Sequence, residues 1–171
     1  MTKIVNALAY ICQGACVVWQ NGLVTDDEAM TLTVRLLAAA NALVDGIQAG
    51  GAARGFTDVR PAYGFAFTLL SAGGATITEL AAHLGVTRQA AAQLVDEMVA
   101  REYVERQPHP GDGRAQLIVL TERGWACTRA ASAAAADTVR EWAAILGAAE
   151  LRRLSSDLAK LASPERLRPT W

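Results

Sequence analysis

The spacing of apolar residues changes twice within residues 76–124, and these changes predict two helices followed by a β-hairpin. Over residues 80–84 and again over residues 91–98, apolar positions recur three and four residues apart, as on one face of a helix. The predicted buried residues of the two helices are Leu80, Ala81, Leu84, Ala91, Leu94, Val95 and Met98.

The residues around these two faces predict where each helix begins and ends. Thr76 and Glu79 have the spacing of a capping box, in which each side chain satisfies a free backbone N–H group. Gly85 can end the first helix in the left-handed conformation, and Thr87 suits the N-cap of the second. Two short helices joined by a tight turn are typical of a DNA-binding helix-turn-helix, although an αα-hairpin that only packs has the same spacing.

The segment after the second helix favours the DNA-binding interpretation. Residues 103–107 and 117–120 are two β-prone runs, and residues 108–114 between them are rich in turn formers. A β-hairpin directly after a helix-turn-helix is a wing. We therefore expect a winged helix-turn-helix, which is a mainly α fold with a small β-hairpin (α+β).

The rest of the chain is predicted to be helical. We expect a long helix over residues 26–49 ended by Gly50 and Gly51, and a short helix over residues 63–70 with Pro61 at its start. After the wing, Thr121 is expected to cap a helix that reaches residue 146. Gly147 separates it from a last helix over residues 148–162. The apolar surface of these terminal helices is too large for a monomer, so we expect a homodimer with two-fold symmetry.

These elements divide the chain into five parts. The predicted parts are an N-terminal extension (1–25), an N-terminal dimerisation helix and loop (26–60), the winged helix-turn-helix (61–124), C-terminal dimerisation helices (125–163) and a tail (164–171).

The N-terminal extension carries no charge between Lys3 and Asp26. A secretory signal, a short membrane anchor and an additional helix on the dimer all remain open for it. Cys12 and Cys16 lie one helical turn apart, so a redox sensor is a further alternative, although no activating charge lies nearby. Acidic residues follow Val24, and translation starting near Val24 or Met30 would leave the extension out of the native protein.

Composition excludes several classes of function. The formal net charge is −1, and residues 76–124 hold seven acidic and five basic residues, so DNA binding must depend on where the arginines are placed. The three cysteines suit a reducing cytoplasm, and no cysteine or histidine has metal-ligand spacing. No nucleophile with a base and no phosphate-binding glycine loop appears. We expect no enzyme, no cofactor, no metal and no membrane partner.

Several short motifs resemble the multiple-antibiotic-resistance regulator (MarR) family. The most specific is Asp-x-Arg in the wing followed by Leu-Thr-x-x-Gly. The resemblance rests on Glu79-Leu80-Ala81, Leu84-Gly85, Thr87-Arg88-Gln89, Leu94-Val95-Asp96, Val104-Glu105-Arg106, Pro110-Gly111-Asp112-Gly113-Arg114-Ala115 and Leu120-Thr121-Glu122-Arg123-Gly124. It implies a dimeric winged-helix transcription factor, usually a repressor that is relieved by a small molecule or by oxidation.

The expected DNA contacts lie on the second helix and on the wing. The helix would enter the major groove of double-stranded operator DNA, where base edges can be read, and wing arginines suit narrow minor grooves. Arg106 would contact phosphate or, alternatively, pair with Glu105 or Glu122 on the protein. The expected contact residues are Thr87, Arg88, Gln89, Ala92, Gln93, Arg106, His109, Asp112 and Arg114.

An effector site is expected between the dimerisation helices and the winged helix. Arg60 and the Tyr63 hydroxyl could orient a small aromatic carboxylate or phenol, and Phe67 could provide an apolar wall. Ordinary core packing is the alternative role for these residues. For the whole protein, the alternatives are redox regulation through the N-terminal cysteines and a winged helix that binds protein instead of DNA.

Overall fold

The computed structural model describes residues 25–161, apart from the side chains of residues 112–114. The expectations for the N-terminal extension, Cys12, Cys16 and the tail fall outside these residues. The chain divides into two compact units, Met1–Ala38 and Ala39–Trp171, and each is described by itself.

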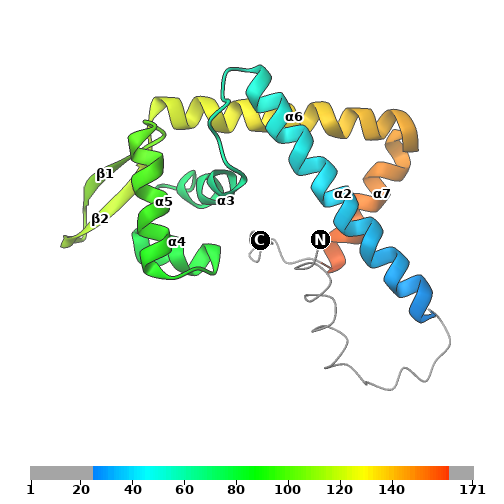
Figure 1. The fold of residues 1–171 in the computed structure, drawn as a ribbon, viewed down its shortest axis with the longest axis horizontal. Coiled ribbons are helices and arrows are strands. Elements are labelled where there is room, and N and C mark those ends of the chain that lie inside the picture. The colour runs from blue at the N-terminus through cyan, green and yellow to red at the C-terminus, as the bar shows by residue number, and fades with distance from the viewer. Residues whose placement is uncertain (1–24, 162–171) are drawn as a thin grey trace. The chain divides into compact units, whose positions relative to one another are not determined.

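Six helices and two strands make up the described part of the chain (Figure 1). They are α2 (Asp26–Ala53), α3 (Pro61–Leu70), α4 (Ile77–Leu84), α5 (Arg88–Ala100), β1 (Val104–His109), β2 (Asp112–Leu120), α6 (Glu122–Leu146) and α7 (Ala148–Leu161). This order confirms the predicted winged helix-turn-helix with long helices before and after it.

The helix-turn-helix has the boundaries that its sequence predicts. Thr76 and Glu79 form the capping box, with the Thr76 N–H donating to the Glu79 carboxylate at 2.8 Å. Gly85 ends α4 in the left-handed region, with φ of 68°. Thr87 caps α5 by accepting a hydrogen bond from the Ala90 N–H at 3.2 Å. Local capping chemistry therefore sets where both helices begin.

The wing has longer strands and a tighter turn than the sequence predicts. β1 and β2 pair antiparallel from Val104 opposite Leu120 to Pro108 opposite Gln116, and a shift in register precedes the pair of His109 with Asp112. Only residues 110 and 111 separate the strands, so the expected turn over residues 108–114 is wrong. Pro108 is tolerated in a strand because an edge position needs no N–H donor.

Helix α2 also continues past the glycines expected to end it. A Cβ atom on Gly50 would lie 2.5 Å from the Cβ atom of Ala134, and one on Gly46 would overlap the side chain of Thr138. These glycines allow α2 to approach α6 closely, and this contact outweighs the low helix propensity of glycine. The predicted end at residue 49 is therefore wrong, and α2 reaches Ala53.

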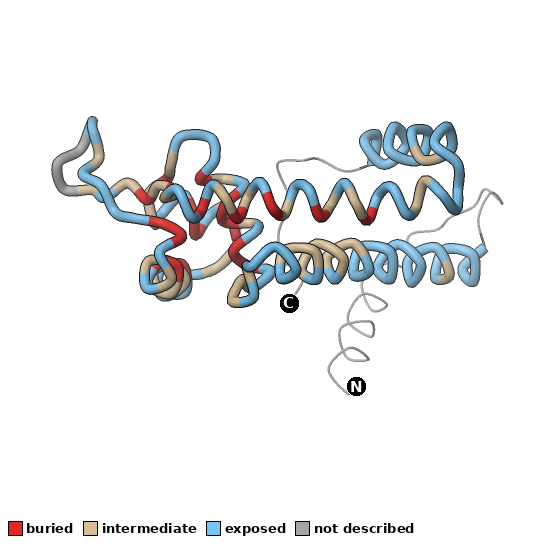
Figure 2. Tube along the Cα trace, turned by 90° about the horizontal axis from the view of Figure 1, so that it is seen from above, coloured by how far each residue is buried: buried red, intermediate tan, exposed pale blue. Residues whose placement is uncertain are grey.

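The core lies within the winged helix. Buried residues concentrate in this region and along one side of α6 (Figure 2). The core's largest fully buried side chains include Tyr63 of α3, Leu80 of α4, Met98 of α5 and Ile118 of β2. By contrast, no residue of α2 or α7 is buried. By length and composition alone, α2 could also cross a membrane.

Candidate nucleic-acid interface

Helix α5 presents one face to the core and the opposite face to solvent. Ala91, Val95 and Met98 are buried, as the sequence predicts, whereas Leu94 is only half-buried. The expected DNA-reading residues Thr87, Arg88, Gln89 and Gln93 are exposed, and Ala92 is half-buried beside them. The exposed side chains lie at or near the start of the helix, where free N–H groups favour an anion such as phosphate.

The wing is tied to α5 by an ion pair. Arg106 of β1 donates to the Asp96 carboxylate of α5 at 2.5 Å. The partner is neither Glu105 nor Glu122, which were the alternatives weighed from the sequence. The pair joins the two elements expected to touch DNA, and it holds the Arg106 guanidinium against the protein.

At the wing tip, His109 supports the turn. Its Nδ1 atom accepts a hydrogen bond from the Gly111 N–H at 3.1 Å, and its side chain is half-buried. Asp112 and Arg114 lie in the first residues of β2, but their side chains are outside the description. The pairing of Asp112 with Arg114 therefore stays a prediction.

Several acidic residues near the reading face form hydrogen bonds or ion pairs within the protein. Glu79 is held in the capping box, where the Thr76 N–H lowers the pKa of its carboxyl. Asp96 pairs with Arg106, and Glu97 pairs with Arg60 at 2.7 Å. These contacts reduce the repulsion that a phosphate backbone would meet from a segment with a formal excess of acids.

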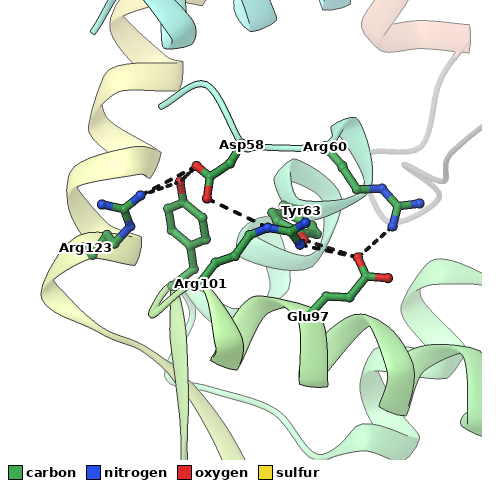
Figure 3. Close-up of polar contacts among 7 residues, drawn as sticks. Asp58, Arg60, Tyr63, Glu97, Arg101 and Arg123 are labelled. Carbon is green, nitrogen blue, oxygen red and sulfur yellow. Dashed lines mark hydrogen bonds and ion pairs between the residues drawn. The ribbon is translucent and has the colours of Figure 1, made fainter. Parts of the chain in front are cut away.

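A chain of polar contacts runs behind α5, from Arg60 to Arg123 (Figure 3). Glu97 accepts from Arg60 and from the Tyr63 hydroxyl, and Arg101 donates to that hydroxyl. The Arg60 hydrogen bond is the main cause of the lowered pKa of Glu97. Arg101 also faces Asp58, with Nε 3.8 Å from the carboxylate.

Asp58 continues this chain towards α6. It accepts a hydrogen bond from the Tyr103 hydroxyl at 2.6 Å and lies 3.6 Å from the Arg123 guanidinium. The Tyr103 hydrogen bond lowers the pKa of Asp58, and burial, with that bond, raises the pKa of Tyr103 to about 12. Sequence reasoning missed this cluster. Only Glu97 and Arg101, four residues apart on one helix, offered a signal.

The Leu-Thr-x-x-Gly motif joins the wing to α6. The Thr121 N–H donates to the Tyr103 carbonyl at 3.1 Å, and the Thr121 hydroxyl accepts from the Gly124 N–H at 3.1 Å. A Cβ atom on Gly124 would overlap the Tyr103 carbonyl oxygen. The motif therefore has a steric cause, because only glycine lets the first turn of α6 lie against the start of β1.

Two cavities border these contacts. The larger, about 360 Å³, is lined by residues of the segment before α3 and of α3–α5, including Arg60, Leu84, Gln93 and Glu97. The smaller, about 50 Å³, lies between α2, α3 and α6 and is lined by Phe56, Phe67 and Cys127 among others. Of the expected effector residues, Arg60 and Phe67 border different cavities, and Tyr63 is fully buried in the core.

Cys127 is a buried free thiol at the smaller cavity. Burial raises the pKa of this thiol to about 11, so it stays protonated near neutral pH and reacts slowly with oxidants. Within residues 25–161, no group of three or more His, Cys, Asp or Glu side chains could hold a metal ion.

Residues 55–115, which run from just after α2 into β2, match the sequence profile of the MarR family. The winged helix-turn-helix of this chain is therefore similar to that of the MarR family, a family of winged-helix transcriptional regulators that is not enzymatic. No protein with a curated description matches the chain.

Solved structures show the same similarity. MarR from E. coli in its apo form is 26% identical, with a TM-score of 0.62 over 75% of this chain and 96% of that chain. RV1404 from Mycobacterium tuberculosis is 25% identical, with a TM-score of 0.67 over 82% and 98%. The transcriptional repressor CouR, bound to a 23-mer DNA duplex, is 25% identical, with a TM-score of 0.65 over 84% and 100%.

Proposed function

We propose that this protein is a MarR-type cytoplasmic repressor that binds pseudo-palindromic double-stranded DNA as a homodimer. The observation that carries the proposal is the exposed start of α5 beside a wing that the Arg106–Asp96 pair ties to it. The 25% identical repressor CouR is described bound to a DNA duplex, which supports the same use of this surface. In a two-fold dimer, the half-sites would lie about one helical turn apart.

Each expected contact residue has a proposed role at this surface. Gln89 and Gln93 read adenine, and Arg88 reads guanine or holds phosphate, because these side chains match the donors and acceptors of those base edges. Thr87 and Ala92 lie against the backbone and the groove wall. At the wing, Arg114 enters the minor groove with Asp112 orienting it, while His109 lies near phosphate. Arg106 contacts phosphate only if it leaves Asp96.

A second copy of the chain would cover the exposed apolar surface of the terminal helices. In the Ala39–Trp171 unit, Ile145, Leu146, Leu154, Leu158 and Leu161 are exposed although large and apolar. In the Met1–Ala38 unit, Leu32 and Leu36 of α2 are also exposed. Arg35 and Asp45 lie within α2, and charges at such positions favour a helix paired in water over one in a bilayer.

We further propose that a small aromatic carboxylate or phenol releases the DNA. Phe67 borders the smaller cavity, which at about 50 Å³ can take only part of such a ligand, whereas Arg60 borders the larger one of about 360 Å³. Arg60 and the Tyr63 hydroxyl both donate hydrogen bonds to Glu97 of α5. A ligand carboxylate that binds either donor would therefore break one of its contacts with the reading helix. The ligand can act only through a difference in its affinity for the two states of the protein.

The test of DNA binding is selection of duplexes from a random pool, followed by affinity measurements across salt concentrations. We expect an enriched pseudo-palindrome and a steep linear fall of log affinity with log salt, because phosphate contacts release counterions. The control is the Arg88→Ala, Gln93→Ala double variant, which keeps the buried face of α5. No enrichment, or an affinity independent of salt, would instead indicate a winged helix that binds protein.

The test of effector release is a pair of titrations with salicylate and other aromatic acids, with and without the selected operator. Thermodynamic linkage requires that operator DNA weaken ligand binding by the factor by which ligand weakens DNA binding. Equal ligand affinity in both titrations would contradict release for that compound.

A further inference from the structure

The buried side chain of Tyr103 belongs to two clusters at once. Its ring centroid lies 6.4 Å from that of Phe56, 5.8 Å from that of Phe67 and 6.0 Å from that of Tyr63. Phe56 and Phe67 both line the smaller cavity between α2, α3 and α6. The Tyr103 ring therefore packs directly behind two walls of that cavity.

The hydroxyl of the same side chain faces the polar cluster of Figure 3. It donates to Asp58 at 2.6 Å and accepts from Arg123 at 3.3 Å. Asp58 also pairs with Arg101, which is the C-cap of the reading helix α5. The Arg123 guanidinium lies over the Tyr103 ring, 4.8 Å from its centroid.

The backbone of Tyr103 is fixed on both sides. Its N–H donates to the Met98 carbonyl in the last turn of α5 at 2.9 Å, and its carbonyl accepts from the Thr121 N–H at 3.1 Å. A ring with no exposed surface and a fixed backbone cannot absorb a displacement by moving into solvent, because a packed interior transmits strain.

We propose that Tyr103 is the positioning residue that couples the smaller cavity to the reading helix. A group that fills the cavity displaces Phe56 and Phe67, the Tyr103 ring moves with them, and its hydroxyl leaves Asp58. The Asp58 carboxylate then loses the hydrogen bond that orients it towards Arg101, and the bond from the Tyr103 N–H to the Met98 carbonyl carries the shift to the end of α5. This inference deepens the proposed release of DNA and rests on it for its consequence, but the coupling within the protein can be measured without DNA or ligand.

Two glycines make such a measurement possible. Gly64 of α3 and Gly51 of α2 line the cavity, and a Cβ atom at either would meet no atom within 4 Å. Gly64→Ala therefore adds a methyl group without pressing on a wall. Gly64 is exposed at the mouth of the cavity, so Gly64→Leu adds a longer side chain that has to reach into the cavity to press on its aromatic walls. The two variants remove the same glycine from α3, so their difference isolates filling of the cavity.

The experiment measures amide hydrogen exchange over residues 88–101 in full-length protein free of DNA. We expect Gly64→Leu to speed exchange near the end of α5 by about tenfold over Gly64→Ala, within the range of about 5- to 150-fold typical of coupling between sites. In a Tyr103→Phe background, which keeps the ring and removes the hydroxyl, the difference should fall to within about twofold. Circular dichroism and urea unfolding check that each variant folds.

Tyr63→Phe is the matched comparison, because Tyr63 contacts Phe67 and also donates to Glu97 of α5. We expect the filling effect to persist in that background. An effect that survives Tyr103→Phe, or that only Tyr63→Phe removes, would overturn the assignment. If Gly64→Leu does not fold, Gly51→Leu is used to fill the cavity from α2. A folded variant that fills the cavity without changing hydrogen exchange in α5 would also overturn the assignment.

Operator affinity, measured on the same variants, separates the two proposals. If the parent selects no DNA while exchange over residues 88–101 still responds through Tyr103, the proposed function fails and the coupling stands. If the parent binds an operator and Gly64→Leu weakens operator binding equally with and without the Tyr103 hydroxyl, the proposed function stands and the coupling through Tyr103 fails.

Discussion

The winged helix and the terminal helices differ in how they bury their apolar side chains. From α3 to β2, every helix and strand contributes to one core, which contains fully buried Tyr63, Leu80, Met98 and Ile118. Helices α2 and α7 bury none of their residues, although both carry a leucine-rich face. Helix α6 belongs to both regions, since its first half buries Cys127 and its last turn leaves Ile145 exposed.

This difference indicates that the winged helix is stabilised within one chain and that the terminal helices need another chain. Exposed apolar patches of that kind mark interaction surfaces in soluble proteins. Substitutions in the two regions should therefore have separable effects. Those in the winged helix should change stability or DNA reading, whereas those in the terminal helices should change association first.

The largest effect is expected at α7. Leu154→Glu with Leu158→Glu places charges on the exposed leucine face, and burying them in a dimer would cost several kcal/mol. The doubly substituted protein should sediment as a monomer at micromolar concentration and lose most operator affinity, because two half-sites would no longer be bound together.

Ser156→Glu is the control, because residue 156 lies on the opposite side of α7 from Leu154 and Leu158. It should remain a dimer. A parent protein that is itself monomeric at that concentration would contradict the comparison between the two regions.

The next largest effect is expected where α6 meets the wing. Gly124→Ala forces a Cβ atom against the Tyr103 carbonyl, and overpacking of this kind typically costs about 1–3 kcal/mol. Urea unfolding should show this loss. Gly64→Ala is the matched glycine, with open space for its Cβ atom, and it should leave stability unchanged or raise it by up to about 1 kcal/mol. Equal effects at the two positions would argue against a steric role for Gly124.

Substitutions at the DNA surface should change binding and leave folding intact. Arg114→Ala should weaken binding to operators with A·T-rich flanks by about 1–3 kcal/mol. Unchanged operator affinity in folded Arg114→Ala protein would rule out the wing contact.

Gln93→Ala should instead relax the base preference at one half-site position without changing the salt slope, since a base contact carries sequence information and a phosphate contact does not.

The smallest effect is expected at the tie between helix and wing. Asp96→Asn removes the charge that holds Arg106, and exposed ion pairs of this kind contribute about 0–1 kcal/mol to stability. The freed guanidinium should bind phosphate, so affinity for random DNA should rise and the salt slope should steepen by about one. A flat response would mean that Arg106 does not reach the DNA backbone.

Local sequence signals accounted for most of the winged helix. The capping box at Thr76, the left-handed Gly85 and the N-caps Thr87 and Thr121 depend on neighbouring residues only, so they could be predicted. The exposed reading face of α5 followed from the same 3.6-residue periodicity that placed Val95 in the core.

Features that depend on distant residues could not be predicted. Gly50 looked like a helix end because its contact with Ala134 of α6 lies far along the chain. Asp58 and Tyr103 are 45 residues apart, and no local pattern marks their hydrogen bond. The left-handed conformation of Glu102, with φ of 61°, likewise has no signature in the residue type.

The close approach of α2 to α6 also has a consequence for how the protein is made. Gly46 and Gly50 meet Thr138 and Ala134, which leave the ribosome more than 80 residues later. At about 5–20 residues per second, this contact between α2 and α6 can form only on the order of 4–20 s after the glycines of α2 have been synthesised. The winged helix, whose contacts are mostly local, can fold during that interval. During that interval, nascent α2 lacks the α6 surface against which Gly46 and Gly50 pack.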